Sequence, residues 1–560
     1  MTSTVSVNAP VPYISRRSAV LGTQYMVAST QPLACQAGVA VLEQGGNAAD
    51  AAVAVAAALG VTEPFSTGLG GDCFCLFYSA RDRAVRGLNG SGRAPAALTI
   101  ERLATEFGIA GDAIPDRNVH AVTVPGAAAG WVDTVAQFGS GRVTLEQILE
   151  PAVALAEDGF PVGELTAPFW QDGAALLRGT ADGHELLVDG ETPRAGQVVR
   201  NPTLAHTLRL LGRHGRDGFY SGPVADAIVQ AVQAQGGVLS HADLAGHTST
   251  LDEPISYEYR GHRLHECAPN GGGLAALLAL GIIDALEESG AVPPVAEQVH
   301  NGPAYLHMVV EALRLAFADA RQFVCDPTFA RVPVAELLSR EYLAGRAAKF
   351  DPARASVDVV HGAPLGGSDT VYFAVVDRAG NACSFVNSLY HGFGTGIVPR
   401  GCGFALHDRG CLFRLDAAHA NSLAPGKRPY HTIIPAMVTA PAGELAMAFG
   451  VMGGFNQPQA HVQVLLNIVR HGMNAQAALD APRISIQVDD GGHIAIEEGI
   501  APTTIAALRG MGHRVYVVSG LQRSVVGRGQ VIRQTTDARR GTRVLEAGSD
   551  PRADGQAVGR

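Results

Sequence analysis

The chain has 560 residues, of which 47% are hydrophobic and 17% are charged, and its formal net charge is −10 at pH 7. This composition excludes an intrinsically disordered chain, and a negative charge without any Lys/Arg-rich run argues against general nucleic-acid binding. The length alone predicts two to four folding units, because single hydrophobic cores stop growing at about 250–300 residues.

The sequence carries few signals of targeting or of metal binding. Arg16-Arg17 could belong to a twin-arginine signal, but no sustained apolar run follows, so we interpret the pair as part of the mature fold. The longest apolar runs, 51–61 and 274–283, are too short to span a bilayer, which predicts a soluble, cytoplasmic protein with no membrane partner. The eight cysteines are predicted to be buried reduced thiols. Cys73-x-Cys75 lacks a second pair or nearby histidines, so no metal site is predicted.

Two helices and a strand are predicted near the N-terminus. Residues 32–46 start at a proline, end in two glycines and carry apolar residues at helical spacing. Asn47 can cap a second, Ala-rich helix through Leu59 that is apolar on all sides and therefore predicted to be buried. The glycine-rich loop 68–72 precedes a predicted strand at 73–78 rather than a helix, so it is not a phosphate-binding loop.

Helices are predicted to dominate the middle of the chain. Another strand and turn occupy residues 85–100, a helix lies near Trp131, and the texture from about 140 to 350 is mainly helical. The clearest helical segments are 145–158, 223–235, 274–289 and 304–324. Residues 350–369 lose this periodicity and are predicted to form a mobile connector.

Strands dominate after residue 370. Alternating or apolar runs predict strands at 371–376, 382–388, 434–440 and 445–451, followed by one helix at about 458–471. The last twenty residues are polar and rich in Gly and Arg, and are predicted to be frayed. A helical first two thirds and a strand-rich last third predict a layered α/β architecture with one shared core.

Thr370 is the residue in this pattern with the most distinctive chemistry. It begins a strand after a pliable glycine-rich approach that ends at Asp369. If the chain were cut before Thr370, its hydroxyl would be a nucleophile and its new α-amine the base. The alternative is an ordinary strand-starting threonine, which is favoured there because it is β-branched.

Several stretches together resemble the γ-glutamyltransferase family of N-terminal-nucleophile hydrolases. The resemblance runs from about residue 25 to beyond residue 500, and its order and spacing make it specific. The matching segments are GGNAADAA at 45–52, TEP at 62–64, GLGGD at 68–72, VPG at 124–126, Asp369-Thr370, VVD at 375–377, GNA at 380–382, FGTGIV at 393–398, PGKRP at 425–429 and Gly453-Gly454.

The resemblance implies a four-layer αββα fold and a precursor that cuts itself between Asp369 and Thr370. The products would be a large subunit, residues 1–369, and a small subunit, residues 370–560, that stay together as a heterodimer. Thr370 would then attack a small-molecule amide, such as the γ-glutamyl amide of glutathione, and pass the acyl group to water or to an acceptor amine. Ser388 matches a hydroxyl residue that hydrogen-bonds the nucleophile, and Gly453 and Gly454 match the oxyanion hole. No metal or organic cofactor is implied, and a higher oligomer is left open.

The sequence departs from the family where the substrate's amino-acid end would bind. Ser91 stands at the position matching the arginine for the α-carboxylate, and Arg93 lies two residues further on. Leu412 replaces the acid for the α-amino group, and Tyr390 replaces an asparagine near the nucleophile. His431-Thr432 take the place of paired serines.

These changes resemble a divergent branch that includes oxamate amidohydrolase, which suggests a small anionic acyl group as the alternative to a γ-glutamyl group. Arg409, Arg93 and His431 are the candidates for the cationic site that such a group needs, although each of them can equally have a surface or structural role. A third alternative is an unprocessed scaffold or binding protein. The joint presence of Thr370, Ser388 and the glycine pair argues against that alternative.

Overall fold

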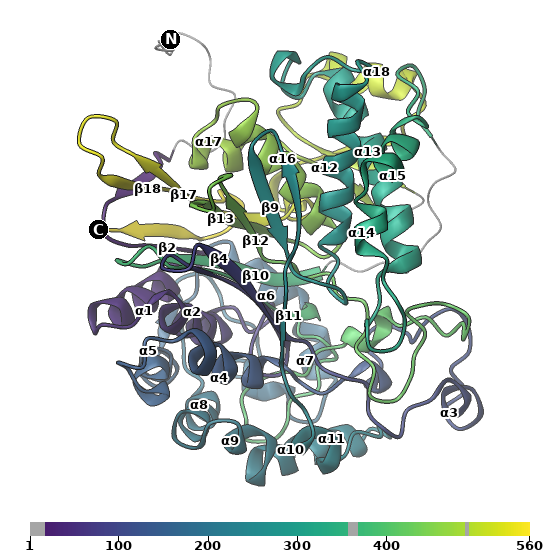
Figure 1. Ribbon diagram of the computed structural model, residues 1–560. Coiled ribbons are helices and arrows are strands. Elements are labelled where there is room, and N and C mark those ends of the chain that lie inside the picture. Colours follow the sequence, from purple (N-terminus) through teal and green to yellow (C-terminus); the bar gives the residue numbers. More distant parts are fainter. Residues whose placement is uncertain (1–16, 357–367, 488–491) are drawn as a thin grey trace.

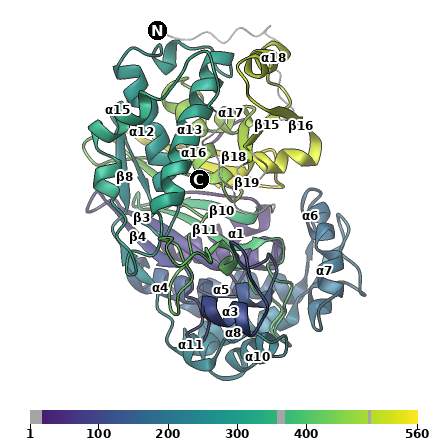
Figure 2. The ribbon, with the colours of Figure 1, turned by 90° about the vertical axis from the view of Figure 1, so that its right-hand side faces the viewer.

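The computed structural model describes residues 17–356, 368–487 and 492–560. Two seven-stranded antiparallel sheets lie face to face in the middle, and helices cover the outer face of each sheet (Figure 1; Figure 2). This arrangement confirms the predicted four-layer αββα fold.

The strands of each sheet come from distant parts of the sequence. The first sheet has the order β1 (Val20–Gly22), β18 (Arg543–Ser549), β17 (Arg528–Thr536), β13 (Leu445–Met452), β12 (Ala436–Thr439), β9 (His262–Glu266), β8 (Ile255–Tyr259). The second has the order β19 (Gln556–Gly559), β2 (Met26–Ser29), β10 (Ser368–Val376), β11 (Ala382–His391), β3 (Asp72–Ser79), β4 (Ala84–Gly90), β7 (Thr250–Asp252). Two small sheets contain β5 (Phe160–Pro161) with β6 (Val198–Val199), and β14 (Ile484–Gln487), β15 (His493–Glu497) and β16 (Val515–Val518).

The helices divide between the two outer layers. On the outer side of the second sheet lie α1 (Pro32–Glu43), α2 (Ala48–Thr62), α4 (Ala127–Phe138), α5 (Leu145–Asp158) and α8 (Pro202–His214) (Figure 1). On the outer side of the first sheet lie α12 (Leu274–Glu288), α13 (Pro303–Phe323), α15 (Arg340–Ala347), α16 (Asn456–Val469) and α17 (Ala475–Asp480). The other helices are α3 (Ile100–Thr105), α6 (Thr166–Asp172), α7 (Ala174–Arg178), α9 (Asp217–Tyr220), α10 (Gly222–Gln233), α11 (His241–Ala245), α14 (Val334–Leu337) and α18 (Pro502–Gly510), and a 3₁₀ turn, η4, covers Arg409–Leu412.

Helix α2 is the buried helix that the sequence predicts, and it anchors the hairpin that carries Thr370. Asn47 accepts from the N–H groups of Ala49 and Asp50, while Asp50 accepts from the Asn47 N–H, which completes a capping box. Every residue of α2 is buried. The Ala48 N–H also donates to Asp377, in the turn between β10 and β11, so the helix start fixes the turn of the hairpin.

The alternation of β10 decides which way Thr370 points. Val371 and Phe373 pack in the cluster between the second sheet and its helices, whereas Tyr372 and Ala374 pack in the cluster between the two sheets. Since side chains alternate along a strand, Thr370 faces the inter-sheet side with Tyr372.

The middle of the chain is mainly helical, as predicted, although it also contains the short strands β7, β8 and β9. One sequence prediction is wrong, because the supposedly frayed C-terminus contains β18 and β19. Strand β19 pairs with β2, and β18 pairs with β17 and β1, so pairing with residues far away in the sequence orders an otherwise polar segment.

Most of the predicted connector, residues 357–367, lies outside the described residues. All eight cysteines are free and buried, as predicted. Among the described helices, none combines the length and apolar character needed to cross a bilayer.

Candidate active site

The predicted nucleophile lies at an irregularity in the β10–β11 pairing. Asp369 pairs with Tyr390 and Thr370 pairs with Ser388, so the register shifts between Asp369 and Thr370 and leaves Leu389 as the extra residue. Tyr390 has a positive φ of 75°, a conformation that costs a non-glycine residue about 1–3 kcal/mol. Bulges of this kind are common beside active sites, and this one coincides with the predicted cleavage bond.

Ser388 links the nucleophile to the rest of the site. Its Oγ lies 2.9 Å from Thr370 Oγ1, and both residues are fully buried. It accepts hydrogen bonds from Arg409 Nη2 at 3.0 Å and from the Tyr390 N–H at 2.9 Å. Either hydroxyl can be the donor in the contact between Ser388 and Thr370. When Ser388 donates, its hydrogen bond to Thr370 Oγ1 favours the deprotonated form of that hydroxyl.

Arg409 brings two of the other predicted residues, Thr432 and Tyr390, together with Ser388. Its side chain is fully buried, Nη1 donates to Thr432 Oγ1 at 2.8 Å, and the guanidinium carbon lies 4.4 Å from the centre of the Tyr390 ring. Burial lowers the pKa of Arg409, and the Asp72 carboxylate acts in the opposite direction. Arg409 therefore holds Ser388 in place. Its Nη1 and Nη2 groups, which could otherwise bind a substrate anion, donate to Thr432 and Ser388.

Asp72 is the negative partner of this cluster, and the sequence alone predicts no separate role for it. Its Oδ1 accepts from the N–H groups of Gly92 and Gly126 at 2.9 and 3.2 Å, and its Oδ2 accepts from His431 Nε2 at 3.0 Å. Burial alone would raise the pKa of Asp72, but His407, His431 and Arg409 lower it overall. A carboxylate at the very start of a buried strand, after a run of glycines, was the sequence signal for this role.

His431 does not fit the cationic role for which the sequence makes it a candidate. Burial and the charge of Arg409 lower its pKa to about 3, so it is neutral at pH 7 and serves as a donor to Asp72. The neutral ring also packs edge-on against Phe74, with centroids 5.0 Å apart.

Ser91 and Arg93 lie in a neighbouring hydrogen-bond group. Ser91 Oγ donates to Asn89 Oδ1 at 2.7 Å, whereas Arg93 Nη1 donates to the Thr248 carbonyl at 3.0 Å. Arg428 reaches the same Thr248 carbonyl and the Ser91 carbonyl. The structure thus groups Ser91 and Arg93 with Arg428 rather than with Ser388 and Arg409.

Gly453 and Gly454 form the turn between β13 and α16. Both have positive φ, at 130° and 55°, and a Cβ on Gly453 would lie 3.3 Å from the Gly527 Cα. Their carbonyls accept from the N–H groups of Asn456 and Gln457. Within the described ranges neither glycine N–H has a partner, which leaves two adjacent backbone donors for a ligand oxygen.

Two groups of side chains have the composition of a metal site, but internal partners occupy both. In the group His307, Glu311 and His513, Arg314 forms an ion pair with Glu311 at 2.9 Å and supplies the positive charge there. In the group Asp116, His391 and Cys411, burial raises the pKa of the Cys411 thiol well above its usual value, whereas a thiol ligand must be deprotonated. Neither group contains the predicted nucleophile.

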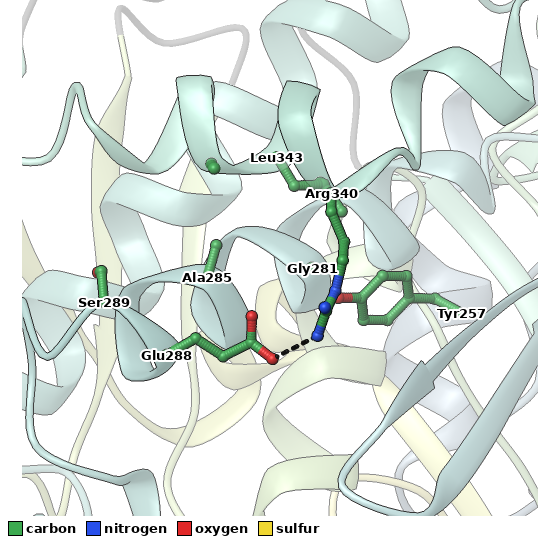
Figure 3. A pocket seen from close by; sticks show the side chains of 8 residues that line it. Tyr257, Gly281, Ala285, Glu288, Ser289, Arg340 and Leu343 are labelled. Carbon is green, nitrogen blue, oxygen red and sulfur yellow. Dashed lines mark hydrogen bonds and ion pairs between the residues drawn. The ribbon is translucent and has the colours of Figure 1, made fainter.

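A pocket on the outer helical layer is separate from this cluster. Its walls come from β8, α12 and α15, and Arg340 pairs with Glu288 at 2.9 Å (Figure 3). Tyr257 also lines it and donates to Asp284. None of the predicted catalytic residues contributes to its walls, so it is not the reaction site.

Buried neutral histidines predict a loss of stability at acidic pH. The pKa values of His431, His247 and His513 are each lowered to about 3, in every case chiefly by burial. As the pH falls, the unfolded chain therefore takes up protons at these histidines before the folded chain does. The free energy of unfolding that they contribute is fully present above pH 6.5 and is lost as the pH falls from 6.5 toward 3. Each histidine should lower the free energy of unfolding by about 2 kcal/mol between pH 7 and pH 5.

Thermal unfolding at pH 7 and pH 5, at equal ionic strength, measures this loss. His247→Phe keeps a ring beside Tyr220 and removes one titrating group, so its decrease between the two pH values should be smaller than that of the wild type. An equal decrease in both proteins would contradict the assignment for His247.

Comparisons with known proteins point to one family. The family model described as gamma-glutamyltranspeptidase matches residues 34–560. The chain is 35% identical to the glutathione hydrolase-like YwrD proenzyme of Bacillus subtilis, covering 96% of this chain and 99% of that protein. It is 34% identical to the oxamate amidohydrolase proenzyme of Klebsiella pneumoniae, covering 97% and 99%. Among solved structures, the cephalosporin acylase of Bacillus halodurans is similar with a TM-score of 0.87 at 40% identity, covering 99% of each chain.

Proposed function

The chain belongs to the gamma-glutamyltranspeptidase family and is a γ-glutamyltransferase-like hydrolase, and from this premise we propose that it activates itself by cutting the Asp369–Thr370 bond. The relatives named above are proenzymes. The observation that carries the proposal is the buried contact between Thr370 Oγ1 and Ser388 Oγ, at the register shift of β10.

The cleavage step is an acyl shift from nitrogen to oxygen. Thr370 Oγ1 attacks the carbonyl carbon of Asp369 and gives up its proton, the C–N bond to Thr370 breaks as that nitrogen takes up a proton, and the acyl group becomes an ester on Oγ1. Water then hydrolyses this ester. The main-chain carboxylate of Asp369 becomes the C-terminus of the first chain, and Thr370 keeps a free α-amine and a free hydroxyl.

Turnover uses the same hydroxyl. The α-amine accepts the Thr370 hydroxyl proton as Oγ1 attacks the substrate amide, and the proton passes to the departing amine. The N–H groups of Gly453 and Gly454 stabilise the oxyanion, and each such donor contributes about 3 kcal/mol. Water hydrolyses the acyl-enzyme, or an acceptor amine takes the acyl group.

Purified wild-type protein tests the cleavage step directly. Mass spectrometry and N-terminal sequencing should find two chains, 1–369 and 370–560, with Thr370 as the first residue of the second. A scaffold protein would give one uncut chain of 560 residues, and that result would end the proposal.

A second proposal concerns the substrate, and Leu412 supports it. Leu412 packs against two hydrophobic clusters, so the position offers no carboxylate for the ammonium of a γ-glutamyl group. We therefore propose that an acyl group that carries a carboxylate but no amine, as in oxamate, is preferred to a γ-glutamyl group. A panel of oxamate, glutathione and γ-glutamyl-p-nitroanilide compares the two classes. Efficient γ-glutamyl turnover would contradict this preference.

A further inference from the structure

The first residue of α16 carries a side-chain amide that makes no hydrogen bond. Asn456 is only 4% exposed, and in the described part of the chain neither its Nδ2 nor its Oδ1 has a partner. Most buried polar atoms in folded proteins are hydrogen-bonded, because a buried donor or acceptor without a partner is unfavourable. The amide of Asn456 therefore needs an explanation.

Helix capping does not explain this amide. Asparagine is favoured at the position before a helix, where its side chain accepts from backbone N–H groups of the first turn, as Asn47 does at the start of α2. In α16 that position belongs to Phe455, and no side chain caps the helix. Asn456 is already inside the helix, so its amide does not stabilise the helix start.

The side chain of Asn456 lies against Gly453. The Asn456 N–H donates to the Gly453 carbonyl at 2.9 Å and closes the turn between β13 and α16. A Cβ placed on Gly453 would lie 3.5 Å from both Cβ and Nδ2 of Asn456. Gly527 is the second neighbour, since a Cβ there would lie 2.7 Å from Asn456 Nδ2 and 2.1 Å from the Met452 carbonyl. The amide is thus packed between two glycines, and one of them belongs to the predicted oxyanion hole.

Three hydrogen-bond donors meet at the start of α16. The N–H groups of Gly453 and Gly454 have no partner within the described ranges, and Asn456 Nδ2 lies against the first of these glycines. The first turn of this 14-residue helix contains no acidic side chain, so the positive end of the helix dipole adds to the three donors. Backbone N–H groups and side-chain amides are the donors that stabilise oxyanions in hydrolases.

From these contacts we propose that Asn456 is a further catalytic residue, whose Nδ2 donates a third hydrogen bond to the oxyanion beside the N–H groups of Gly453 and Gly454. This inference rests on the proposed function and adds one residue to it. The oxyanion forms when Thr370 Oγ1 attacks the substrate carbonyl, and it returns to a carbonyl when the amine departs. No atom passes to Asn456. Its hydrogen-bond partner exists only during turnover, which explains the unbonded amide of the resting protein.

Asn456→Leu tests the role, because it removes the amide with little change in size. In the cleaved enzyme kcat should fall by about 10²- to 10³-fold, while KM changes by less than about threefold, because the oxyanion exists only in the transition state. The loss should appear with both oxamate and p-nitrophenyl acetate, which form the same oxyanion on different acyl groups. Asn456→Asp replaces the donor with a carboxylate that repels the oxyanion, so it should be at least as impaired as Asn456→Leu.

Thermal stability separates a catalytic role of Asn456 from a structural one. A side chain that held the turn together would lower Tm when replaced. Since the amide is unbonded in the resting protein, Asn456→Leu should keep Tm or raise it by about 1 °C while kcat falls.

Gln530→Met is the matched control. Gln530 is fully buried and its amide also lacks partners among the described residues, but it lies inside β17, paired with Gly450 and Ser549. This variant should likewise keep or raise Tm, and its kcat should stay within about twofold of the wild type.

Self-cleavage and wild-type turnover separate this inference from the function on which it rests. If the wild type stays uncut, or hydrolyses neither substrate, the proposed function fails. If cleaved Asn456→Leu keeps its kcat, or loses kcat together with a fall in Tm, the catalytic role of Asn456 is overturned. Equal losses of kcat in Asn456→Leu and Gln530→Met would overturn it as well. Loss of self-cleavage in both Asn456→Leu and Asn456→Asp would also overturn it, because Asn456 would then serve the precursor.

Discussion

Replacing Thr370 with alanine should leave the chain as a single uncut polypeptide and abolish amide hydrolysis. The hydroxyl is both the group that cuts the Asp369–Thr370 bond and the group that attacks the substrate, so one substitution removes both reactions. By analogy with the loss of an activated nucleophile in other hydrolases, the activity should fall by at least about 10⁴-fold. Denaturing electrophoresis and mass spectrometry report the cleavage, and an amide assay reports the turnover.

The matched control is Thr370→Ser, which keeps the hydroxyl and should still be cut, though more slowly. Thr370→Ala should remain folded, because it loses only one buried methyl group and one hydrogen bond, which together contribute about 2 kcal/mol. Cleavage of the alanine variant before residue 370 would show that another residue supplies the nucleophile.

The predictable parts of the fold are those whose signals are local. Asn47 and the run of alanines after it specify α2, because the cap and the apolar face lie within one helix. The hairpin of β10 and β11 is equally local, since the turn at 377–381 sets its register. Strands such as β7 and β19 have only three or four residues, which is too short for a periodic pattern, and their stability comes from partners far away in the sequence.

The site divides in the same way. Thr370 and Ser388 are neighbours across one hairpin, so the resemblance to the family identified both. The role of Arg409 depends on which acceptors surround it after folding, and sequence patterns do not specify that. His431 shows the same limit, because its neutral state follows from burial and from a charge that lies 22 positions away in the sequence.

Asp72→Asn should be the most damaging change to the stability of the site. Asp72 is the carboxylate that compensates the buried charge of Arg409, and it accepts a hydrogen bond from His431 Nε2. The Ile433 N–H contacts His431 Nδ1 at 3.4 Å, which favours the tautomer that carries its proton on Nε2. An asparagine N–H at that position would face the His431 N–H donor, and Arg409 would keep an uncompensated charge. Loss of one partner of a buried ionic group costs about 3–5 kcal/mol.

For a chain of this length, that cost corresponds to a fall in Tm of about 3–4 °C, accompanied by a loss of activity as Arg409 and Ser388 shift. The double variant Asp72→Asn/Arg409→Met decides whether the Arg409 charge is the cause. If it is, removing the buried cation restores part of the lost stability, and the double variant is less destabilised than the sum of the two single variants. Additive losses would show that Asp72 acts through Gly92, Gly126 and His431 alone. Activity separates the two roles further, because the double variant should regain stability without regaining turnover, since Ser388 then lacks the guanidinium that holds it against Thr370.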